Sequence, residues 1–302
     1  MSIFILPHSV TKEVEKLCRG FLWGWNGSRS KLHVASWEKV CLPKTYGGLG
    51  LEDGIKWNQA ILAKYVWAIS SKRDILWVKW VNNIYLKSKN WWDYELKSDT
   101  SWYWRKLCHL RDKFSCEDII KARTGTKFKA ALLYNSSILQ SPFEYIKFIW
   151  CSINMPKHRF IFWQAINSQL LSRDKFEHFH IKLDNVLCPV CEAAPESNAH
   201  LFFDCWFSQQ VVEKVCGWLG IKLWPTGFHS WKQWLVLNDR DKKHRVHVST
   251  MAAMIYFIWS NRNNCLFNKF SSTASKITQD IKETLYHRLH VAKGRNLKDH
   301  EK

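Results

Sequence analysis

Four residues in the second half of the chain follow a spacing that restricts the fold more than any other feature of the sequence. Cys188, Cys191, His200 and Cys205 form the pattern C-x2-C-x8-H-x4-C. Zn2+ takes four soft or borderline ligands in a tetrahedron, and three cysteines with one histidine are a standard set. A two-residue spacer lets both thiolates of a tight turn face one ion. The spacing therefore predicts a structural site with Zn2+ as its cofactor.

Other uses of these cysteines fit the sequence less well. A redox CxxC motif belongs in a βαβ context, which the sequence does not suggest. A zinc deaminase needs an upstream H-x-E motif, and the chain contains none. Four protein ligands leave no open position for a substrate, which disfavours hydrolytic zinc chemistry. His178 and His180 precede the motif and stay open as alternative ligands, although exposed helix histidines are the simpler interpretation.

The remaining hydrophobic pattern is helical, and it predicts a mostly α fold. His200 and Cys205 cannot share a helix face, because five residues turn about 500° around the axis; the chain must turn or begin a helix between them. We expect helical units around a Cys3His hairpin that resembles a zinc knuckle. The expected helices cover residues 11–23, 55–69, 75–86, 101–110, 141–150, 172–180, 208–219, 231–237, 250–267 and 275–290, with another opened by Pro156.

The charge of the chain indicates polyanionic partners. There are 45 Lys and Arg against 26 Asp and Glu, a formal net charge of +19. Such an excess favours nucleic acid first. The longest strongly apolar run, 251–259, is too short to span a membrane, and the N-terminus has no basic region of a signal peptide. We expect an intracellular protein, in the nucleus or cytoplasm, with no membrane partner and no small-molecule substrate.

One basic stretch outside the cysteine block is the candidate nucleic-acid contact. Lys121, Arg123, Lys127 and Lys129 surround Thr-Gly-Thr at 124–126, which predicts a loop rather than an apolar helix face. Such cations suit phosphate contacts, which position a nucleic acid without reading its sequence. The 19 tryptophans allow a second interpretation, base stacking. Their helical spacing favours packing in the core instead.

Several motifs together resemble the C-terminal region of plant LINE-type (non-LTR) retrotransposon reverse transcriptases. The cysteine block and the motifs just before it resemble the zinc-binding domain of that family. An upstream part resembles the segment that links the polymerase to the zinc-binding domain. The matching motifs are Met155-Pro156-Lys157, Phe162-Trp163, Cys188-Pro-Val-Cys191, His200-Leu-Phe-Phe-Asp-Cys205-Trp206, Phe21-Leu-Trp23-Gly24, Gly47-Gly-Leu-Gly-Leu51, Asn58-Gln-Ala60, Ile258-Trp259, Arg262-Asn263 and Phe267.

The resemblance implies a three-part organisation. Residues 1–95 would be the helical linking segment of the reverse transcriptase, residues 96–224 its zinc-binding domain, and residues 225–302 a C-terminal helical extension. A polymerase palm needs adjacent aspartates to hold two Mg2+ ions, and the chain contains no Asp-Asp dipeptide. We therefore expect a detached C-terminal piece of a retrotransposon polyprotein, without enzymatic activity.

Two functions of different classes follow. The first is a non-enzymatic zinc-binding module that binds RNA or DNA with low sequence specificity. The second is a helical protein-interaction domain whose zinc is purely structural, with a protein partner that the sequence does not identify. The net charge favours the first function.

Overall fold

The computed structural model describes residues 4–23, 34–136, 138, 141–237 and 242–299. It consists of two compact units, residues 1–141 and 142–302, and each is described by itself. The boundary between the units lies within the segment 96–224 that the sequence assigns to one domain, so the three-part division stays a prediction about sequence relationship. No helix in the described ranges is long and apolar enough to cross a membrane.

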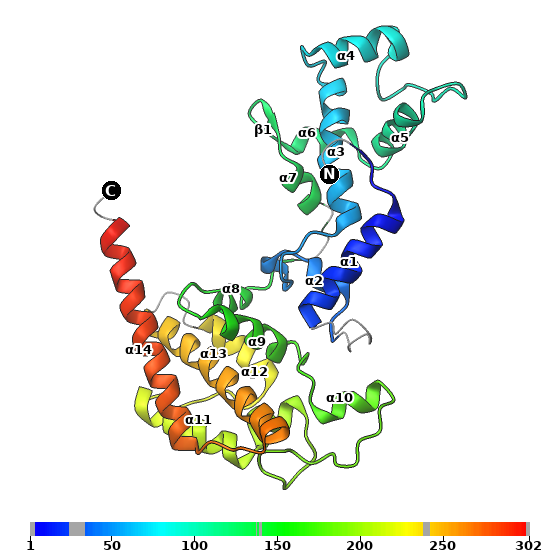
Figure 1. Ribbon diagram of the computed structural model, residues 1–302. Helices are drawn as coiled ribbons and strands as arrows, with labels where there is room; N and C mark the ends of the chain where they lie inside the picture. The colour runs from blue at the N-terminus through cyan, green and yellow to red at the C-terminus, as the bar shows by residue number, and fades with distance from the viewer. Residues whose placement is uncertain (1–3, 24–33, 137, 139–140, 238–241, 300–302) are drawn as a thin grey trace. The chain divides into compact units, whose positions relative to one another are not determined.

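In its described residues, unit 1 is helical apart from one short antiparallel hairpin (Figure 1). Its elements are α1 (His8–Trp23), α2 (Trp37–Cys41), η1 (Lys44–Tyr46), α3 (Gly54–Ser70), α4 (Leu76–Val81), η2 (Asn82–Leu86), α5 (Trp102–Arg111), α6 (Cys116–Lys121), β1 (Arg123–Thr124), β2 (Lys127–Phe128) and α7 (Ala130–Ser136).

Helix α3 is the centre of unit 1 and contacts α1, α5, α6 and α7. Asp53 caps its N-terminus, because its Oδ1 accepts hydrogen bonds from the amides of Ile55 and Lys56 at 3.1 and 2.9 Å. The Asp53 amide in turn donates to the Tyr134 hydroxyl of α7 at 3.0 Å. The buried face of α3, which includes Leu62 and Val66, packs into the core of the unit.

Aromatic side chains fill much of this core, as their helical spacing predicts. Trp104 is buried and lies 4.4 Å from Tyr85 in a stacked arrangement, with Trp91 and Tyr94 at 5.2 and 5.7 Å between ring centroids. Trp102 differs, since it is 59% exposed. Packing in the core is therefore confirmed for Trp91 and Trp104, but not for Trp102.

The glycine-rich run 47–50 is a tight turn. The amide of Gly48 donates to the Pro43 carbonyl and that of Gly50 to the Leu42 carbonyl. Gly47 has φ +86°, and a Cβ on Gly48 would lie 1.9 Å from the Leu42 carbonyl oxygen. Glycine is needed here for conformation and space, and the amides of Gly48 and Gly50 are used within the chain rather than offered to a phosphate.

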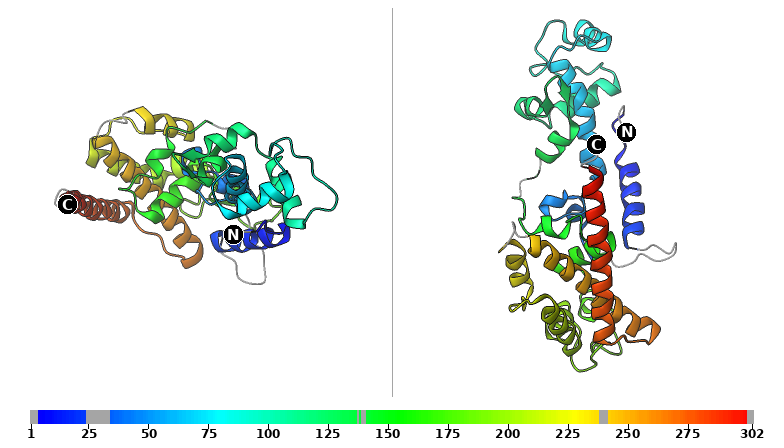
Figure 2. Two further views of the ribbon diagram at one scale, coloured as in Figure 1. Left: turned by 90° about the horizontal axis from the view of Figure 1, so that it is seen from above. Right: turned by 90° about the vertical axis from the view of Figure 1, so that its left-hand side faces the viewer.

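Unit 2 is also helical in its described residues (Figure 1). Helix α13 lies at its centre, with buried Met251, Ile255 and Ile258, and contacts α8, α9, α11 and α14. Figure 2 shows α13 and α14 side by side. The elements are α8 (Ile146–Ile149), α9 (Pro156–Ile166), α10 (Arg173–His178), η3 (His200–Asp204), α11 (Trp206–Leu219), α12 (Phe228–Leu237), α13 (Lys242–Asn263), η4 (Asn264–Asn268) and α14 (Ala274–Asp299).

The expected mostly α fold is confirmed, and most helix ends fall close to their signals. Ser101 caps α5, Pro156 opens α9, and Gly220 ends α11 with φ +66°. One expected boundary is wrong: the helix expected over 141–150 does not begin at 141. Helix α8 begins only at Ile146, and no side chain caps it. Helix α13 begins at Lys242, earlier than the expected start at 250; residues 239–241 lie outside the described residues.

His158 of α9 is the buried histidine of the unit 2 core that has the clearest pKa shift. It is 2% exposed, its ring lies 4.5 Å from that of Tyr256, and its Nε2 has no hydrogen-bond partner among the described residues. Burial, together with the charges of Lys157 and Arg288, lowers the pKa of His158 to about 4.

We expect this histidine to make unit 2 less stable in mild acid. The unfolded chain takes up a proton near pH 6.5, whereas the folded chain does so only near pH 4, so stability present at pH 7 is lost as the pH falls between these values. The loss from pH 7 to 5 is about 2 kcal/mol. Urea unfolding followed by hydrogen exchange of α9 peptides measures it. His158→Phe keeps the ring packing, and an equally large loss in that variant would contradict the assignment.

Candidate metal centre

The two cysteines of the CxxC motif lie on a hairpin held by backbone hydrogen bonds. The Cys188 amide donates to the Ala194 carbonyl, the Glu192 amide to the Cys188 carbonyl, and the Glu196 amide to the Val186 carbonyl, each at 2.8 Å. Leu187 and Pro195 form an antiparallel bridge. This ladder presents Cys188 and Cys191 on the same side of a tight turn.

The other two ligands are brought together by a π-helical turn. The Cys205 amide donates to the His200 carbonyl at 2.7 Å, a bond between residues five apart. Such a turn is wider than an α-helix, so His200 and Cys205 can face the same point. Cys205 then has an extended backbone and is the N-cap of α11. The sequence predicts that the chain turns or begins a helix between the two ligands; the π-helical turn lies between them, and α11 begins only at Trp206, directly after Cys205.

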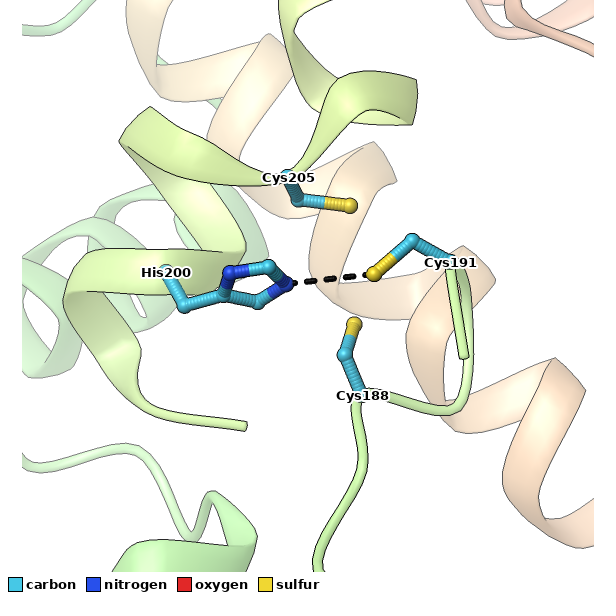
Figure 3. Close-up of side chains that lie close together, drawn as sticks. All are labelled: Cys188, Cys191, His200 and Cys205. Carbon is cyan, nitrogen blue, oxygen red and sulfur yellow. Dashed lines mark hydrogen bonds between the residues drawn. The ribbon is translucent and has the colours of Figure 1, made fainter. Parts of the chain in front are cut away.

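The four side chains converge on one centre (Figure 3). Their ligand atoms all lie within 4.8 Å of one another, and Cys191 Sγ is 3.2 Å from His200 Nε2. Sulfur atoms around a tetrahedral zinc ion with 2.3 Å bonds are about 3.8 Å apart, so the arrangement fits a metal ion after small adjustments. Cys188 and Cys205 are fully buried, while Cys191 and His200 are half-buried.

Backbone amides surround two of the sulfurs. Those of Val190 and Cys191 donate to the Cys188 sulfur, and those of Phe207 and Ser208 donate to the Cys205 sulfur. A hydrogen bond from the Cys188 thiol is the main cause that lowers the pKa of Cys205, and the same bond, followed by burial, raises the pKa of Cys188. Donors aimed at these sulfurs stabilise thiolate, the form that binds metal.

His178 and His180 are not part of this arrangement. Both are exposed, and the group of metal-ligand side chains found in the described part of the chain consists of the four residues above. The structure therefore gives no support to either histidine as an alternative ligand.

A buried ion pair, which the sequence interpretation missed, holds the cysteine hairpin against α13. Arg262 donates from Nε and Nη2 to the two oxygens of Glu196 at 2.5 and 2.6 Å, and the side chains are 3% and 0% exposed. Glu196 also accepts from the Arg173 amide at 2.9 Å. The two partners are 66 residues apart, so local patterns do not reveal the pair, although Arg262 belongs to the motifs that resemble the retrotransposon family.

Breaking this pair on one side is expected to be costly. Arg262→Met leaves the Glu196 carboxylate buried without its partner, so the free energy of unfolding should fall by about 3–5 kcal/mol. Glu196→Gln combined with Arg262→Met removes the stranded charge and keeps an acceptor for the Arg173 amide, so most of the loss should be recovered. A double-mutant cycle by urea unfolding at pH 7 measures this; a loss below about 1 kcal/mol in Arg262→Met would contradict the pairing.

The four basic candidates lie in unit 1, whereas the cysteine cluster lies in unit 2. The expected loop is instead an ordered hairpin: Arg123 pairs with Phe128 and Thr124 with Lys127 across a turn in which Gly125 has φ +59°. All four side chains are exposed. Lys121 is the last residue of α6 and lies 3.0 Å from a Glu117 oxygen. The other three have no ion pair among the described residues.

Fold and site define a helical protein with a Cys3His centre closed by four protein side chains. Residues 128–211, which include the whole centre, match the family described as zinc-binding in reverse transcriptase. The resemblance of the cysteine block to the zinc-binding domain of reverse transcriptases is confirmed.

Two relatives come from Arabidopsis thaliana. One, named as a ribonuclease H protein, is 38% identical over 77 residues, which are 26% of this chain and 12% of the relative. The other is an uncharacterized mitochondrial protein, 28% identical over 116 residues, which are 38% of this chain and 75% of the relative. The chain thus spans only a small part of the first relative. No solved structure matches the chain.

Proposed function

We propose that this chain is a non-enzymatic module whose Cys3His centre binds one Zn2+ through Cys188, Cys191, His200 and Cys205. The convergence of the four ligand atoms within 4.8 Å carries the proposal, and the matching zinc-binding family supports the choice of ion. Bound zinc would act as a structural crosslink, because four protein ligands fill its tetrahedral shell. The sequence also lacks the Asp-Asp pair of a polymerase.

Metal analysis of the purified chain tests this centre. We expect one zinc per chain in the wild type and less than stoichiometric zinc in Cys188→Ser, because a hydroxyl is a poor substitute for a thiolate. Cys216→Ser is the matched control, since Cys216 is a half-buried cysteine of α11 outside the cluster. Stoichiometric zinc in Cys188→Ser, or none in the wild type, would refute the ligand assignment.

We also propose that the chain binds RNA or DNA with little sequence preference, and that the β1–β2 hairpin contacts phosphates. Support comes from the net charge of +19 and from the exposed cations Arg123, Lys127 and Lys129. Cations of this kind release counterions from a phosphate backbone when they bind it. The Lys121 charge adds less, since Glu117 is beside it.

Salt dependence tests the hairpin directly. Replacing Lys121, Arg123, Lys127 and Lys129 with Ala should weaken binding to every sequence alike. In a plot of the logarithm of the association constant against the logarithm of the salt concentration, the magnitude of the slope should decrease. The decrease should be about 0.7 per lost contact on single strands and about 0.9 on duplex DNA. Mobility shifts at several salt concentrations measure it, with zinc content as the control for folding. An unchanged slope would place the contacts elsewhere.

One observation supports the second candidate function, a helical protein-interaction domain. Leu76 and Trp80 of α4 and Ile84 of η2 are 84%, 49% and 52% exposed, although they are large and apolar. Exposed apolar side chains that gather on one short segment are typical of protein interfaces. If the wild-type chain binds no nucleic acid at low salt, this second function becomes the better one.

A further inference from the structure

Two arginines of unit 2 are anchored to one short turn. The turn joins α8 to α9. Arg288 of α14 donates from Nε to the Ile153 carbonyl at 3.0 Å and from Nη2 to the Ser152 carbonyl at 2.7 Å. Arg159 of α9 donates from Nε to the next carbonyl, that of Asn154, at 2.9 Å. Successive Cα atoms are about 3.8 Å apart, so the two guanidinium groups are held close together.

The turn itself is held in place from the inside. Asn154 is buried, and its side-chain amide donates to the carbonyls of Phe148 and Ile149 at 2.9 and 3.0 Å. Its Oδ1 accepts from the Ser249 hydroxyl of α13 at 2.6 Å. The positions of both arginines are therefore fixed by the core of the unit before any ligand arrives.

No carboxylate neutralises this pair among the residues that the structure describes. Neither Arg159 nor Arg288 forms an ion pair there, and the next basic side chain, Lys157, lies over the Tyr256 ring at 4.6 Å. Burial lowers the pKa of Arg159, and the charge of Arg288 lowers it further, which agrees with the closeness of the two guanidinium groups. The turn thus gathers uncompensated positive charge.

A purely structural role explains only part of the arrangement. Cations near the C-terminal end of a helix interact well with its free carbonyls, and α8 ends just before this turn. A single guanidinium would be enough for that task. The bonds to the turn use the Nε atom of Arg159 and leave its two Nη atoms, as well as Nη1 of Arg288, for another acceptor. Both side chains are half-buried, so a ligand can reach them.

We infer that Arg159 and Arg288 form a binding site for a phosphate group of a nucleic-acid strand. Guanidinium groups offer planar, paired donors that suit phosphate oxygens better than a point charge does. Arg159 and Lys157 lie on α9, and Arg288 lies on α14, from which its side chain reaches the turn that follows α8. The inference rests on the proposed binding of nucleic acid, and it adds a contact in unit 2 that is separate from the hairpin of unit 1.

The test uses the full chain loaded with zinc and a labelled single-stranded RNA of mixed sequence. In Arg159→Gln combined with Arg288→Gln, the slope of log K against log salt should fall by about 0.7, one phosphate contact. Arg159→Lys combined with Arg288→Lys keeps the charge and should keep most of the slope. Lys16→Gln combined with Lys276→Gln removes the same charge from lysines already paired with Glu13 and Asp280, and should change the slope little.

A second readout locates the contact. Cys151 is half-buried at the start of the turn and lies near Arg159. RNA should slow alkylation of Cys151 in the wild type but not in the double Gln variant, whereas the exposed Cys18 of α1 should react at the same rate throughout.

The outcomes separate the site from the broader function. RNA binding with an unchanged salt slope in the double Gln variant, at normal zinc content and helicity, would overturn this site while the hairpin proposal stands. Equal alkylation of Cys151 with and without RNA would overturn it as well. A wild-type chain that binds no RNA at low salt would overturn the proposed nucleic-acid binding together with the site.

Discussion

The buried carboxylate of Glu196 joins three parts of unit 2 that are far apart in the sequence. It lies at the end of the cysteine hairpin and accepts a hydrogen bond from the backbone amide of Arg173, the first residue of α10. It also forms an ion pair with Arg262 of α13. A charge this deeply buried is tolerated only when each oxygen has a donor. The hairpin, the start of α10 and the central helix must therefore take up one relative arrangement, which also fixes where the metal ligands face.

The cysteine cluster depends on backbone geometry as much as on residue type. Three hydrogen bonds donated by backbone amides shape the turn that carries Cys188 and Cys191. One π-helical turn aligns His200 with Cys205. The ladder and the π-turn both lie within residues 186–205, so the cluster is assembled locally. Helix α13 contributes no ligand to it. This helix holds the hairpin in place through the ion pair between Arg262 and Glu196.

The sequence predicts local features well and distant pairings poorly. Helix periods, the caps at Ser101 and Gly220, and the CxxC turn depend on neighbouring residues, and each is found. The Glu196–Arg262 pair spans 66 residues, and nothing in either local pattern indicates it. The helix expected over 141–150 begins only at Ile146, and the buried side chains of Ile146 and Ile149 lie within the part that is helical. The basic hairpin was missed because its strands have two residues each.

The spacing of these groups also sets an order of events during synthesis. All four ligands have been synthesised once the chain reaches residue 205, whereas Arg262 is synthesised 66 residues after Glu196. At about 5–20 residues per second, the carboxylate waits roughly 3–13 s for its partner. During that interval the cysteine cluster can already bind its ion, while the surface that α13 later covers is exposed to solvent. The nascent chain would thus pass through a stage in which the metal crosslink exists before the helical core that later encloses it.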